Sequence, residues 1–259
     1  MNISEKQIIE LLESKNYSIK SKYDMNYPMR WAFEVGNLEV IKYPFSRGAS
    51  IDDYAVCSSA KGHLELLDFL YSQDRDIITK NNYSISEACE NGHLEVVKYL
   101  HSKGADIRSN NDEPIRKASE KGHLEIVKYL HLCGADIRAL SDYALRYASK
   151  NGHYEVVEYL ESNGADVRAC SDQAICLASE GHHFKIIKFL YSKGADVRAN
   201  NSCCVYNAVN YISSDEAANK KSLDIVEFLY SKGADIRSYN DRAICWAASG
   251  SGKWSFGNC

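Results

Sequence analysis

The stretch G-H-L-E-V-V-K-Y-L, from Gly92 to Leu100, decides the fold because the chain repeats it. Close copies begin at Gly62, Gly122 and Gly152, so the repeat length is 30 residues. A fixed period of this size is typical of a solenoid of stacked units rather than of a globular enzyme. We therefore expect any functional surface to be a repeated one.

Each unit has the apolar pattern of two short helices. Ile115 and Ala118, three residues apart, indicate the buried face of a first helix, and Val127 and Leu130 indicate that of a second. Pro114 fits a first helical position, where its missing N–H is not needed. The sequence thus predicts an all-α array of helix-turn-helix units.

Glycine supports this division of the chain, since twelve of the fifteen glycines fall at two places per unit. Both places need a positive φ to reverse the chain. The glycines that separate the paired helices are Gly36, Gly62, Gly92, Gly122, Gly152 and the shifted Gly181. Those that close the second helix are Gly48, Gly104, Gly134, Gly164, Gly194 and Gly233.

Composition and charge argue against several functional classes. The 259 residues carry a net charge of −4 with both signs interspersed, so no basic stripe is available to a phosphate backbone. No stretch of about 18 apolar residues occurs, and residues 1–20 lack the apolar segment of a secretory signal. Nine cysteines without a recurring C-x-x-C spacing indicate reduced thiols. The sequence predicts a soluble cytoplasmic protein with no nucleic-acid or membrane partner.

The units resemble the ankyrin repeat, whose consensus runs T-P-L-H-x-A-A-x-x-G-H-x-x-V-V-x-x-L-L-x-x-G-A-D-V-N. The resemblance covers roughly residues 27–248 and is closest in the second half of the unit. The T-P-L-H tetrad has drifted and reads E-P-I-R from Glu113. The interval from Gly104 to Gly122 is about three residues shorter than the family's, which removes the tip of its β-hairpin finger. The resemblance implies an all-α ankyrin-repeat solenoid with shortened β-hairpin turns.

In its trimmed turns and its asparagine and tyrosine content, the chain is similar to a particular kind of ankyrin protein. Giant DNA viruses of amoebae (mimivirus-like) encode such proteins in large paralogous sets. This resemblance implies a protein without cofactor or chemistry of its own, which presents a concave surface to a protein of the host, in the host cytoplasm if the chain is viral.

The repeat pattern divides the chain into three parts. We expect residues 1–25 to form a capping helical segment, because terminal units are atypical. Residues 26–249 hold about seven units and a terminal half unit, with a polar insert at 212–222 that we expect to be a loop. We expect residues 250–259 to form a tail and the last unit to lack a second helix. Its apolar end would then be covered by the tail, with Trp254 and Phe256 folding back, or by self-association. Pro44 predicts a kink or an early end of its helix near Tyr43.

Two rows of recurring side chains need interpretation. Histidines recur at His63, His93, His123, His153 and His183. Neighbouring units should lie roughly 8–10 Å apart, whereas ligands about 2 Å from one zinc ion must converge. We therefore predict turn-stabilising histidines and no metal site.

The second row consists of arginines that each follow an aspartate by two residues. Its members are Arg108, Arg138, Arg168, Arg198 and Arg237. They could grip an acidic partner bidentately. The alternative is a solvated ladder in which each arginine meets an aspartate of its own or the next unit.

Residues that vary between units at positions the scaffold leaves free are candidates for partner recognition. In ankyrin proteins recognition uses the turn tips and the adjoining exposed face of the first helix. The resemblance carries this role to Tyr83, Asn111, Asp112, Glu113, Ser141, Asp142, Tyr143, Asp172, Gln173, Asn201, Tyr239, Asn240 and Arg242. We expect Tyr83 and Tyr143 to be the anchors, because rigid aromatic side chains contribute contact area at low entropic cost.

The sequence thus predicts a non-catalytic protein–protein interaction scaffold whose partner is unidentified. One alternative is a substrate-recognition adaptor for a ubiquitin ligase, although no F-box-like segment is recognisable. Others are a truncated paralogue without a selected partner and an enzyme with a pocket hidden in the array. No catalytic motif such as H-E-x-x-H or G-x-S-x-G is visible, and Cys176 and Cys245 are interpreted as small apolar side chains.

Overall fold

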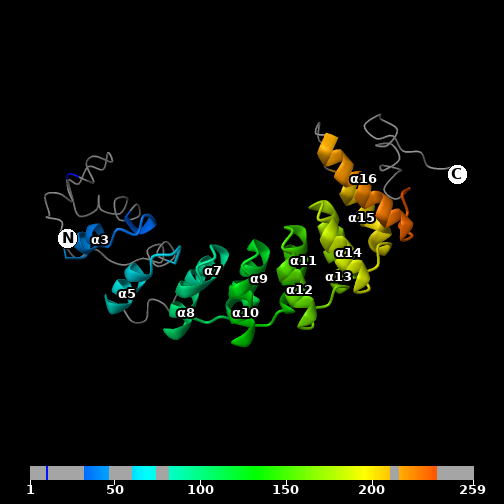
Figure 1. Cartoon of the computed structure of the whole chain (residues 1–259). Helices are drawn as coiled ribbons and strands as arrows, with labels where there is room; N and C mark the ends of the chain where they lie inside the picture. Colours follow the sequence, from blue (N-terminus) through cyan, green and yellow to red (C-terminus); the bar gives the residue numbers. More distant parts are fainter. Residues whose placement is uncertain (1–9, 11–31, 47–59, 74–81, 211–215, 238–259) are drawn as a thin grey trace. The chain divides into compact units, whose positions relative to one another are not determined.

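A computed structural model describes residues 10, 32–46, 60–73, 82–210 and 216–237 of the chain. The chain divides into two compact units, residues 1–114 and 115–259, and each is described by itself. Within the described residues every regular element is a helix, as the repeat pattern predicts (Figure 1).

The first unit contains helices from the early repeats. They are α3 (Leu38–Ser46), α5 (Leu64–Gln73), α7 (Tyr83–Glu90) and α8 (Leu94–Ser102). Helix α7 packs against α8, and α8 packs against α5. The next helix, α9 (Ser109–Lys121), contains the boundary between the two units.

The second unit has two rows of helices. Its elements are α10 (Leu124–Leu132), α11 (Ala139–Lys150), α12 (Tyr154–Ser162), α13 (Ala169–Glu180), α14 (Phe184–Ser192), α15 (Ala199–Asn210) and α16 (Glu216–Ser231). The first helices of the repeats, α11, α13 and α15, pack side by side (Figure 1). The second helices, α10, α12 and α14, pack in the same order. Each repeat is therefore buried by its neighbours.

The core uses the same positions in every repeat. In α10, Ile126, Val127 and Leu130 are at most 1% exposed, whereas Leu124 at the start of the helix is only half-buried. The first helices contribute alanines and larger aliphatic side chains, such as Ala144. Burying one such aliphatic side chain contributes about 1.5–3 kcal/mol. The buried helix faces that the repeat pattern predicts are thus confirmed.

A left-handed turn lies at the start of each first helix from α9 to α15, just inside the bounds of the element. Three consecutive residues have φ between 51° and 61° in each turn. The sets are Asn110, Asn111 and Asp112; Leu140, Ser141 and Asp142; Cys170, Ser171 and Asp172; and Asn200, Asn201 and Ser202. This conformation costs about 1–2 kcal/mol per residue for L-amino acids. In the described residues these turns replace the β-hairpin that the resemblance implied in shortened form.

Hydrogen bonds within the turn offset this strain. In the turn at the start of α11, Asp136 Oδ1 accepts the backbone N–H of Arg138 at 2.8 Å. The N–H of Asp142 donates to the carbonyl of Arg138 at 3.0 Å. Arg146 then donates from Nη2 to the carbonyl of Leu140 at 2.8 Å. The tight turn is therefore held by three polar contacts.

Ten of the predicted glycines have a positive φ, and Gly181 does not. At that place His182 takes the left-handed conformation, with φ 57°. Gly48 lies outside the described residues. Because Gly181 is shifted by one position, the left-handed conformation at this turn is adopted by His182.

Two local expectations need correction. Helix α3 continues to Ser46, so the early end predicted near Tyr43 is wrong, whereas the alternative kink at Pro44 stays a prediction. The insert at 212–222 is not a loop throughout, because α16 begins at Glu216 and absorbs its second half. The predicted tail and nearly all of the predicted cap lie outside the described residues. Among the described helices, none has the length and apolar character needed to cross a membrane.

Candidate protein-binding surface

The aspartates that end the left-handed turns connect neighbouring repeats. Asp142 is 2% exposed, and its Oδ1 accepts the backbone N–H of Asp166, in the next repeat, at 2.9 Å. The same oxygen lies 3.4 Å from Nε of Arg138. Asp172 repeats the arrangement with the N–H of Asp196 at 2.8 Å. These carboxylates hold one repeat to the next.

The exposed position that we predicted for three site residues is therefore wrong. Asp112, Asp142 and Asp172 are 5%, 2% and 3% exposed, because the left-handed turn directs their carboxylates inward. These three aspartates are therefore not part of the exposed candidate surface. No pattern in the sequence predicts this burial, since aspartate at a turn is usually solvated.

We expect Asp142→Ala to lower the free energy of unfolding by about 1–3 kcal/mol, because the N–H of Asp166 loses its acceptor and Arg138 its ion-pair partner. Asp142→Asn should lose much less, since an amide oxygen can accept the same bond. Asn82 does so for the N–H of Asp106 at 3.3 Å. Urea denaturation measures both variants, and an equal loss in the two would contradict the assignment.

The arginine row forms ion pairs with the same turns. Arg108 Nε lies 3.1 Å from Asp112 Oδ1, and Arg198 Nε lies 3.0 Å from Asp196 Oδ1. Arg138 reaches Asp142, and its Nη2 lies 3.9 Å from Asp166 of the next repeat. This is the ladder interpretation. The more exposed pair, Arg198 with Asp196, contributes about 0–1 kcal/mol, whereas the carboxylates of Asp112 and Asp142 are buried.

Histidines of this row join neighbouring repeats within each of the two units. His153 Nε2 donates to the carbonyl of Glu120 at 3.0 Å, and its ring lies directly over Gly122. His63 makes the same 3.0 Å bond to the carbonyl of Glu34. A side chain at the glycine would overlap the imidazole, so the glycine and the histidine of consecutive repeats depend on each other.

These contacts predict a pH dependence of stability. Burial lowers the pKa of His153 and of His183 below the ordinary value of 6.5. The unfolded chain therefore binds more protons in this range, so their contribution to stability is complete above about pH 6.5 and is lost as the pH falls through the folded pKa values. We expect the free energy of unfolding to fall as the pH is lowered below about 6.5, the ordinary pKa of the histidines in the unfolded chain. The His153→Gln/His183→Gln variant should show a shallower slope, and equal slopes would contradict this origin.

Tyr143 is the centre of an aromatic and cationic stack on the first helices. Its ring stacks on Tyr147 with centroids 4.0 Å apart, and the guanidinium of Arg116 lies 5.0 Å from its centroid. The hydroxyl donates to Glu120 Oε2 at 3.2 Å. Burial is the main cause that raises the pKa of Tyr143 to about 12, so the hydroxyl remains a donor at neutral pH. Tyr143 is thus half-buried and held in place by its neighbours.

The remaining predicted site residues divide into three groups. Tyr83 is 64% exposed on α7 of the first unit. Asn111, Ser141 and Asn201 are exposed at the turn tips, whereas Glu113 and Gln173 are half-buried at helix starts. Tyr239, Asn240 and Arg242 lie outside the described residues.

Arg146 is a site residue that sequence reasoning missed. Its Nε donates to the carbonyl of Ser141 at 3.0 Å, and its Nη1 donates to Oε1 of Gln173 in the next repeat. The available signal was an arginine at the same register as Arg116, one repeat earlier. Arg146 therefore shapes the surface between two turn tips.

An open groove of about 600 Å³ runs along two successive turns of the second unit. Its lining includes Asp136, Arg138, Ser141, Asp166 and Cys170. The groove is lined by side chains of both charge signs.

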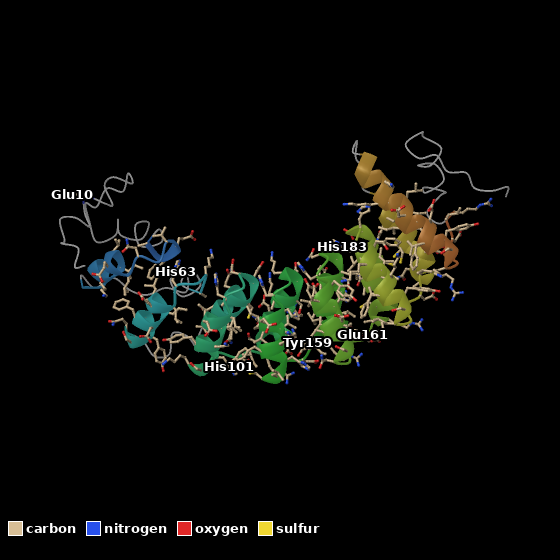
Figure 2. The ribbon with its side chains drawn as sticks, viewed as in Figure 1. Glu10, His63, His101, Tyr159, Glu161 and His183 are labelled. Carbon is tan, nitrogen blue, oxygen red and sulfur yellow. The ribbon has the colours of Figure 1, made fainter. Side chains whose placement is uncertain are left out.

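Side chains of the second helices make polar contacts with neighbouring repeats. Tyr159 and His131 approach to 2.9 Å, and Lys193 Nζ lies 2.8 Å from Glu161 Oε2. Figure 2 shows Tyr159 and Glu161 on α12 and His183 near the start of α14. The polar groups of Tyr159 and Glu161 are thus bonded to side chains of neighbouring repeats.

Comparison with known families agrees with this architecture. Residues 54–141 and 115–201 match the family described as "Ankyrin repeats (3 copies)", and together these stretches span more than half of the chain. The chain belongs to the ankyrin repeat family. Ankyrin repeats generally mediate protein–protein interaction and are typically non-catalytic. A comparison with curated proteins finds no match.

Proposed function

We propose that the chain is a non-catalytic scaffold that binds a protein partner through the turn tips and the starts of its first helices. The observation that carries this proposal is a constant framework with changing side chains at one register. The exposed turn position is asparagine, serine, serine and asparagine in successive repeats, at Asn111, Ser141, Ser171 and Asn201. Such variation on a rigid support suits recognition of one particular surface.

The position two residues further along varies more strongly. It holds Glu113, Tyr143, Gln173 and Cys203 in successive repeats, and all four are half-buried. Their side chains therefore present an acidic group, an aromatic ring, an amide and a thiol at regular intervals. A partner that matches this order would be distinguished from one that does not.

We further propose an intracellular setting and a partner from the host cell, which rests on the resemblance to ankyrin proteins of giant DNA viruses alone. A role as a ubiquitin-ligase adaptor is a separate proposal. It would be favoured by recovery of ligase subunits together with the partner.

The test compares two matched pairs of serine substitutions. Ser141→Arg/Ser171→Arg places bulk and charge on two turn tips, whereas Ser162→Arg/Ser192→Arg places the same groups at the ends of α12 and α14; all four serines are exposed. A protein captured from a cell lysate on the immobilised chain is purified and titrated against each variant. We expect the first variant to weaken binding about 10-fold or more and the second to leave it unchanged.

Circular dichroism and urea denaturation confirm that both variants remain folded. Loss of binding only in the Ser162→Arg/Ser192→Arg variant would move the interface to the second helices and contradict the proposal. Equal binding by both variants would contradict it as well.

A further inference from the structure

Three thiols form a cluster inside the second unit, where α13 packs against α15. Cys176 lies on α13, and Cys203 and Cys204 are adjacent on α15. The three sulfur atoms all lie within 4.8 Å of one another, and Cys176 Sγ is 2.7 Å from Cys204 Sγ. Cys176 and Cys204 are 2% and 0% exposed, whereas Cys203 is half-buried. The cluster therefore reaches solvent through Cys203.

The register explains why these side chains meet. Cys176 corresponds to Arg146 one repeat earlier, and Cys203 corresponds to Gln173. Arg146 and Gln173 are hydrogen bonded across the two repeats. The same two positions are therefore in contact one repeat earlier, where they hold the polar pair Arg146 and Gln173. The interpretation of Cys176 as an isolated apolar side chain therefore changes, because thiols replace a polar pair at an established contact.

We propose that Cys176, Cys203 and Cys204 bind one thiophilic metal ion of the Zn²⁺ or Cu⁺ class. Soft thiolate ligands select these ions over Mg²⁺, Ca²⁺ or Mn²⁺, which prefer oxygen. Each thiol that ligates the ion loses its proton to solvent. Three thiolates and one Zn²⁺ leave a net charge of −1, which is a smaller charge to hold in the protein than three thiolates alone.

The distances suit such an ion after a small adjustment. A Zn²⁺ ion about 2.3 Å from each sulfur in tetrahedral geometry holds the sulfurs roughly 3.8 Å apart. The observed separations, from 2.7 Å upward and all within 4.8 Å, require shifts of about 1 Å. A solvent molecule on the Cys203 side would complete the four ligands of Zn²⁺. Cu⁺ would need no fourth ligand.

The test uses the full chain, reduced with a phosphine and freed of metal. Zn²⁺ is titrated against a chromophoric chelator, and native mass spectrometry counts the bound ions. We expect one tightly bound Zn²⁺ per chain. Cys203→Ala should weaken its binding by about 100-fold or more, because it removes a ligand at a half-buried position that tolerates alanine. Cys170→Ala, which removes an exposed thiol from the same α13, should leave it unchanged.

A second readout keeps the test independent of folding. Co²⁺ bound in place of Zn²⁺ should show a thiolate charge-transfer band in the chain that Cys203→Ala weakens, while circular dichroism of the two proteins agrees. A Cu⁺ competition then tells which of the two ions is preferred, and displacement or retention of Zn²⁺ both support a thiophilic site. Equal Zn²⁺ affinity in the chain and in Cys203→Ala would overturn the proposal. A Cys176–Cys204 disulfide that persists under phosphine, with no metal bound, would also overturn it.

Discussion

Gly122→Ala is expected to lower the free energy of unfolding by about 2–5 kcal/mol, from backbone strain and from overlap with a fixed ring. Gly122 has φ +82°, which costs alanine about 1–2 kcal/mol. A methyl group there would also stand 2.7 Å from Cε1 and Cγ of His153. That ring cannot move aside freely because Nε2 donates to the carbonyl of Glu120 at 3.0 Å. The overlap therefore adds about 1–3 kcal/mol.

Gly134→Ala is the matched control for this prediction. Gly134 has φ +96°, and a methyl group there has no neighbour within 4 Å. We expect it to lose only the backbone contribution of about 1–2 kcal/mol. Urea denaturation gives both values, and the difference between them is the cost of the overlap with His153. The two glycines losing the same amount would show that the histidine contact has no energetic weight.

A double-mutant cycle isolates the contact further. His153→Ala removes the ring, so Gly122→Ala in that background should cost about as much as Gly134→Ala. The coupling energy between Gly122 and His153 is then about 1–3 kcal/mol. Strict additivity of the two substitutions would argue that the ring lies elsewhere.

Leu130→Ala is expected to destabilise the chain by about 2–5 kcal/mol, because it removes a fully buried side chain and leaves a cavity. Leu130 is 0% exposed on α10, within the apolar face that also holds Ile126 and Val127. Helix α12 of the next repeat packs against α10, so the cavity has little room to collapse. Urea denaturation followed by circular dichroism measures the loss.

Leu132→Ala on the same helix supplies the control. Leu132 is 84% exposed, two residues after Leu130. The same chemical change should therefore alter the free energy of unfolding by less than about 0.5 kcal/mol. A comparable loss at both leucines would contradict the assignment of the buried face.

The effects of these substitutions should spread beyond the repeat that carries them. In a stacked array each repeat is stabilised chiefly by the interfaces with its neighbours. His153 and Asp142 belong to such interfaces. The turn tips that we propose as the recognition surface are placed by these interfaces, and loss of an interface would also displace the tips.

The period of the sequence by itself determined the all-α class, the pairing of helices and the core positions. Valine, isoleucine and leucine recur at fixed places in each copy of the segment that begins at Gly92, and helix geometry then puts them on one face. Glycine at a recurring place likewise determined the reversal of the chain, since only glycine adopts the required φ without cost. These are local properties of the chain.

The tertiary structure alone decided which polar and sulfur atoms meet between repeats. Asp142 reads as a solvated turn residue, yet it is buried because three residues adopt the left-handed conformation and direct its carboxylate toward Asp166. Cys176 reads as an apolar side chain, yet it meets Cys203 and Cys204 of the next repeat. The physical reason is that a sequence period measures distance along the chain. Contacts between repeats depend on how each helix is rotated against its neighbour, and packing sets that rotation.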